Sequence, residues 1–75
     1  MTIEYTCSVL NRDSDIMYSA SEESLEAARK RINYYRELVR NNGEEDIVNY
    51  IEITKDRLDE DGEIISSKVI ETHSI

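Results

Sequence analysis

The isoleucine and threonine residues of this 75-residue chain are almost all excluded from one internal stretch. Nine of the ten Ile and all four Thr lie outside residues 22–41. Because β-branched side chains favour strands over helices, we expect this stretch to be the helix and its flanks to form strands. Residues that favour helix starts precede the stretch and residues that favour helix ends close it: Ser19, Ser21, Glu22, Glu23 and Ser24, then Arg36, Arg40, Asn41, Asn42 and Gly43.

The expected helix is amphipathic. Its apolar residues recur at steps of three and four and form one stripe, which predicts a helix with a single buried face. The stripe consists of Leu25, Ala28, Ile32, Tyr35, Leu38 and Val39.

Four segments outside the helix have strand patterns. Residues 3–9 alternate between apolar and polar side chains, and residues 16–20 do so again after a turn-forming segment. Two β-branched runs, residues 47–55 and 64–72, flank an acidic segment that we expect to close a hairpin at Asp61-Gly62. The sequence therefore predicts a single domain over residues 1–75 with an α+β fold of order β(β)αββ, in which one α-helix packs on an antiparallel sheet of three or four strands.

Both faces of the closing hairpin carry apolar residues in either register that we considered. An even loop places Ile51 and Ile53 with Ile64 and Ile70, leaving Val48, Tyr50, Ile65 and Val69 opposite, whereas a three-residue loop places Val48 and Tyr50 with Ile64 and Ile70. One helix covers only one face, so we expect a partner or a second copy to cover part of the other, with Tyr50 as a contact residue.

The charge balance narrows the choice of partners. Seventeen acidic and nine basic residues give a formal net charge of −8, which disfavours direct nucleic-acid binding or an anionic membrane and favours a basic protein surface. The single cysteine allows no internal disulfide, and no apolar run approaches the roughly 18 residues of a membrane helix. We therefore expect a cytoplasmic protein.

No residue pattern predicts catalysis. The run 57–64 contains the D-x-D-G-x-I core of a calcium loop, but the first and last ligand positions of that loop would fall on Arg57 and Lys68. Cys7 belongs to the inward alternation of the first strand, and His73 is expected to be solvated near the chain end. We expect no catalytic residue, no metal site, no cofactor and no enzymatic activity.

Two charged surfaces are the candidate binding sites. The acidic hairpin is the set Asp56, Asp59, Glu60, Asp61 and Glu63. The arginine flank is the set Arg29, Arg36 and Arg40, which lies along one exposed side of the expected helix.

The layout of the whole chain resembles a group of known small proteins. A strand-turn-strand unit, then Ala20 to Ala27 leading into Arg29-Lys30-Arg31-Ile32, then a closing hairpin, resembles the small acidic helix-on-sheet inhibitors encoded by bacteriophages, anti-CRISPR proteins among them. The resemblance implies an inhibitor that occupies a nucleic-acid-binding surface of a Cas effector in the host-cell cytoplasm.

The residues themselves predict less than the resemblance does. They indicate a compact, acidic protein that binds a larger basic protein or protein–RNA complex. Its own carboxylates would imitate nucleic-acid phosphates in that contact. The alternative is a small nucleic-acid-contacting module that uses the arginine flank. Homodimer formation is left open.

Overall fold

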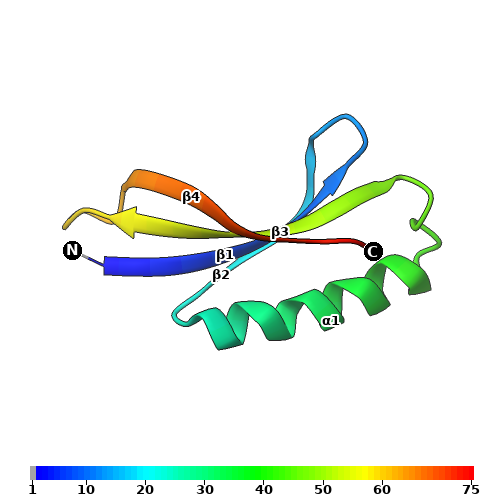
Figure 1. Cartoon of the computed structure of the whole chain (residues 1–75), viewed down its shortest axis with the longest axis horizontal. Helices are drawn as coiled ribbons and strands as arrows, with labels where there is room; N and C mark the ends of the chain where they lie inside the picture. The colour runs from blue at the N-terminus through cyan, green and yellow to red at the C-terminus, as the bar shows by residue number, and fades with distance from the viewer. Residues whose placement is uncertain (1) are drawn as a thin grey trace.

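The structure, a computed structural model, describes residues 2–75 and contains four strands and one helix. In chain order these are β1 (Thr2–Asn11), β2 (Ile16–Glu22), α1 (Leu25–Asn41), β3 (Val48–Leu58) and β4 (Ile64–His73). The strands form one antiparallel sheet of order β2-β1-β3-β4, and α1 lies along one face of it (Figure 1). The predicted α+β fold is confirmed, with four strands rather than three.

The ends of α1 follow from local chemistry. The Ser24 side chain accepts a hydrogen bond of 3.1 Å from the Ala27 amide at the N-terminus, and Gly43 adopts a φ of +66° just after the C-terminus. The helix begins at Leu25 rather than at residue 22, because Glu22 still pairs with Tyr5 in the sheet.

The core lies between α1 and the centre of the sheet. The face of the sheet that α1 covers, here called the helix face, contributes Cys7, Val9, Ile51 and Ile53, all fully buried. The opposite face is here called the open face. The predicted apolar stripe is confirmed, since four of its residues are buried in this core and the other two pack against it: Ala28, Ile32, Tyr35 and Val39, with Leu25 and Leu38 beside them.

The helix is shorter than the sheet. Its 17 residues span about 25 Å at 1.5 Å per residue. The 11 residues of β3 span about 36 Å at 3.3 Å per residue. The closed end of the β3–β4 hairpin therefore projects past the start of α1 (Figure 1).

The two hairpin turns have the same construction. The turns are residues 11–15 and 59–63. In each, the amide of the first residue donates a 2.9 Å hydrogen bond to the carbonyl of the fifth, and the fourth residue, Ser14 or Gly62, has a positive φ. The first side chain, of Asn11 or Asp59, accepts from the amides of the third and fifth residues at 2.9 Å. The predicted turn at Asp61-Gly62 is confirmed, with Glu60-Asp61-Gly62 as its three-residue loop.

Two register shifts between β3 and β4 change which side chains of the hairpin lie on the same face of the sheet. The register with β3 shifts between Arg57 and Leu58 and again between Ile53 and Thr54, so β4 has an extra residue at each point. As a result Ile70 packs against the core that contains Ile51 and Ile53, as the even-loop alternative placed it, although the loop itself has three residues. Val48 is also a core residue at 2% exposure, so the prediction that it forms a surface with Tyr50 is wrong.

The centre of the open face is polar. Thr6 contacts Ser21 at 3.0 Å, and Ser8 contacts Ser19 at 3.1 Å. These side chains lie opposite one another on β1 and β2, so the hydroxyls satisfy each other across the strands. The part of the open face formed by β1 and β2 is therefore polar, whereas β4 still places the exposed apolar side chain of Val69 on this face, as one of the two predicted registers did.

Candidate functional site

The exposed end of the β3–β4 hairpin carries most of the predicted acidic residues. Asp59 is half-buried, and its carboxylate is bound by the amides of Asp61 and Glu63, so it maintains the turn. Glu60, Asp61 and Glu63 are exposed, and within residues 2–75 no ion pair joins them to a cation. These four residues, Asp59, Glu60, Asp61 and Glu63, are here called the acidic tip.

Asp56 does not belong to this exposed end, which corrects the sequence prediction. It is 4% exposed on the open face. The Thr6 hydroxyl donates a 2.6 Å hydrogen bond to its Oδ2, and the Ser67 hydroxyl donates a 2.6 Å hydrogen bond to its Oδ1. Burial acts to raise the pKa of Asp56, but the hydrogen bonds from Ser67, Thr6 and Thr54 outweigh it and lower the pKa. Its carboxylate therefore joins β1, β3 and β4 rather than facing a partner.

Tyr50 lies far from the acidic tip. It is half-buried near the other end of β3 and opposite Leu10 of β1. Asp59 lies nine positions further along the chain, about 30 Å along an extended strand. The structure therefore does not bring Tyr50 and the acidic tip into one site.

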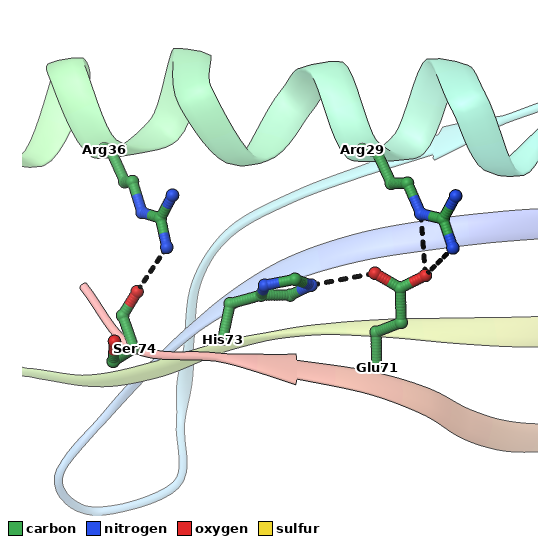
Figure 2. A network of polar contacts seen from close by, with 5 residues as sticks. All are labelled: Arg29, Arg36, Glu71, His73 and Ser74. Carbon is green, nitrogen blue, oxygen red and sulfur yellow. Dashed lines mark hydrogen bonds and ion pairs between the residues drawn. The ribbon is translucent and has the colours of Figure 1, made fainter.

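The arginine flank is largely engaged within the chain. Figure 2 shows Arg29 and Arg36 reaching from α1 to β4 and the residue after it. Arg29 Nε donates a 2.8 Å hydrogen bond to Glu71 Oε2, and Arg36 Nη2 donates a 2.8 Å hydrogen bond to the Ser74 carbonyl. Arg40 is exposed, so the three arginines do not form one free basic surface.

Glu71 is the centre of this network, and sequence reasoning missed it. Arg29 and His73 bind its two carboxylate oxygens and lower its pKa. His73 is a β4 residue whose Nε2 lies 2.8 Å from Glu71, so the prediction of a solvated chain end is wrong. The two-residue spacing, which puts both side chains on one strand face, was the available signal.

Cys7 has the surroundings of a packed thiol. It is fully buried in the core, and burial raises its pKa to about 11, against an opposing effect of Arg31. A thiol with that pKa stays protonated near neutral pH and is a poor nucleophile. The prediction that Cys7 is a packing residue is confirmed.

The described part of the chain shows no built small-molecule site. Across residues 2–75 there is no detected pocket and no group of three or more His, Cys, Asp or Glu side chains that could hold a metal ion. No helix in the same residues is long and apolar enough to cross a membrane.

Comparison with known proteins adds no family to this description. No protein-family model, no curated protein and no solved structure matches the chain.

Proposed function

We propose that this protein is a non-enzymatic inhibitor that binds a basic surface of a larger protein through its acidic tip. The observation that carries the proposal is the position of Glu60, Asp61 and Glu63. They are exposed on a hairpin end that projects past the helix, and no cation of residues 2–75 is paired with them. They are therefore free to meet the cations of a partner.

The rest of the molecule supports an electrostatic mode of binding. A net charge of −8 attracts a basic partner over a distance and raises the association rate by roughly 10 to 1,000-fold at low salt. The turn hydrogen bonds of Asp59 fix the backbone that carries the other three carboxylates. Less conformational entropy is then lost when the acidic tip binds.

The more specific form of the proposal concerns the partner. A surface that binds nucleic acid is rich in Lys and Arg, so closely spaced carboxylates compete with phosphates for it. With the layout described above, this favours a Cas effector as the partner and makes the protein an anti-CRISPR inhibitor.

The test compares two triple variants on an immobilised Cas effector loaded with guide RNA. E60Q/D61N/E63Q should associate at least about tenfold more slowly at low salt and lose most of the salt dependence. The matched control E23Q/E37Q/E45Q neutralises three other exposed carboxylates and should stay close to the parent protein. Equal association rates for both variants would exclude the acidic tip as the binding surface.

The alternative function, nucleic-acid contact through the arginine flank, has weaker support. Arg29 and Arg36 already bind Glu71 and Ser74, which leaves Arg40 as the exposed member. Binding of single-stranded RNA by the protein alone, falling steeply with salt and abolished by R40Q, would favour this alternative.

A further inference from the structure

β4 is an edge strand with an exposed apolar surface. In the order β2-β1-β3-β4, no strand within residues 2–75 pairs with its outer side. Ile64, Ile65 and Val69 are 62%, 57% and 52% exposed. An antiparallel ladder turns alternate amides and carbonyls outward, so this edge offers both unpaired backbone groups and apolar side chains to another strand.

The sequence of this edge is complementary to itself in the antiparallel direction. When two copies of β4 are aligned antiparallel about a twofold axis between Val69 and Ile70, Lys68 of one copy lies opposite Glu71 of the other. Further from the axis, Ser67 lies opposite Thr72, which pairs two hydroxyls, and Ser66 lies opposite His73, which pairs two polar side chains. A twofold interface needs this property, because each contact occurs twice.

The faces of the sheet agree with this register. Lys68 lies opposite Lys55 and Glu71 opposite Ile53, which places both side chains on the helix face. Ser67 lies opposite Asp56 and Thr72 opposite Glu52, which places both on the open face. These four side chains therefore meet their counterparts on the same side of the joined sheet. Val69 and Ile70, next to the axis, lie at the bulge of β4, where Ile70 packs against the core and Val69 lies on the open face.

Charge complementarity identifies a second copy as the occupant. Lys68 lies directly opposite Lys55, an unfavourable pairing of like charges, and neither forms an ion pair with a carboxylate of residues 2–75. Glu71 of a second copy, whose carboxylate also binds Arg29 and His73 of its own chain, would supply a shared carboxylate to Lys68 twice in the dimer. The exposed Val69 side chains of the two copies would meet on the open face beside the axis.

We propose that β4 pairs antiparallel with β4 of a second copy, with the twofold axis between Val69 and Ile70. The dimer has one eight-stranded sheet with both helices on the same face. The acidic tips lie at opposite ends of the joined strands, so the dimer presents two binding ends. This surface is separate from the acidic tip, and the proposal stands whether or not the tip binds a basic partner.

Sedimentation of the full chain from micromolar to millimolar concentration tests the assembly. The parent protein should pass from monomer to dimer, and K68E should weaken the dimer by about tenfold or more, because two carboxylates then face each other. K30E, on the exposed side of α1, makes the same change in net charge, from −8 to −10, and should dimerise like the parent. A parent protein that stays monomeric, or a K30E variant that dissociates as K68E does, would overturn the proposal.

Cysteine cross-linking tests the register. The V69C side chains lie beside the axis, within the 4.4–6.8 Å Cα separation that a disulfide needs, so mild oxidation should give a covalent dimer. I64C is an equally exposed control whose two copies would lie about 36 Å apart. Cross-linking of I64C as fast as V69C would indicate random collision and would contradict the register, as would a V69C variant that does not cross-link. Circular dichroism of both variants checks that they fold.

Discussion

Arg29 of α1 and Glu71 of β4 form an ion pair, with 2.6 Å between Nη2 and Oε2. Arg29 Nε donates to the same oxygen, while His73 binds the other, so one carboxylate of the edge strand joins the helix to β4 (Figure 2). The Glu71 side chain is 18% exposed and that of Arg29 58% exposed, so water partly screens the contact.

The first prediction concerns this carboxylate. The hydrogen bonds from Arg29 and His73 hold the pKa of Glu71 below its ordinary value of 4.5, so its contribution to stability is present above that pH and is lost as pH falls through the lower, folded-state pKa. E71Q should lower the free energy of unfolding by about 1 kcal/mol at pH 7 and by less at pH 3. Urea denaturation at the two pH values measures this. E37Q, on the exposed side of α1, is the control, and an equal loss at both pH values would contradict the ionic role.

The second prediction concerns Asp56. D56A should destabilise the protein by about 2–3 kcal/mol, because it removes the two charge-assisted hydrogen bonds that Thr6 and Ser67 donate to a buried carboxylate. Since the pKa of Asp56 is lowered, the parent protein loses this stability as pH falls below the ordinary value of 3.8, and D56N should show a flatter decline there. Thermal denaturation across pH 2–7 measures both effects. A loss no greater than that of D46A, an exposed aspartate, would show that the network does not stabilise the fold.

The third prediction concerns the two equivalent turns. Ser14 has a φ of +66°, a conformation that glycine adopts without steric cost, so S14G should stabilise the protein by about 0.5–1 kcal/mol. G62A should destabilise it by a similar amount, and only through its backbone, because no atom beyond its two chain neighbours lies within 4 Å of the added Cβ. Chemical denaturation of both variants gives the two values. Changes of the same sign would contradict the shared construction of the turns.

The fourth prediction concerns Cys7. Its thiol is fully buried and its pKa is raised to about 11, so a disulfide reagent at pH 8 should label the native protein only as fast as it opens. In denaturing urea the thiol should react within the mixing time. Labelling followed by absorbance provides the measurement, with R40Q as a folded control. Fast labelling without denaturant would show that the core around Cys7 is open.

Local sequence patterns were sufficient for the elements and for part of the core. The alternation that includes Cys7 and the helical spacing that includes Ile32 and Tyr35 both identified buried residues, because a side chain's direction within one element depends only on its position along that element. The turn at Gly62 was also predictable, since a positive φ is a local requirement that glycine meets.

The candidate site depended on contacts between elements. Asp56 and Asp61 are both aspartates of one hairpin, yet the sheet register buries the first against Thr6 and Ser67 and leaves the second exposed. Arg29 was placed on an exposed flank, but α1 lies across the sheet so that Arg29 reaches Glu71, 42 residues away.

The sequence by itself determined where the helix and strands lie and which of their sides are apolar, because propensity and periodicity act over a few neighbouring residues. Tertiary structure alone decided the two register shifts in β4, the burial of Val48 and Asp56, and the binding of Arg29 and Arg36 by residues near the C-terminus. These features depend on which strands pair and on how the helix crosses them. They are set by the combined packing of all five elements, so no single segment contains the information.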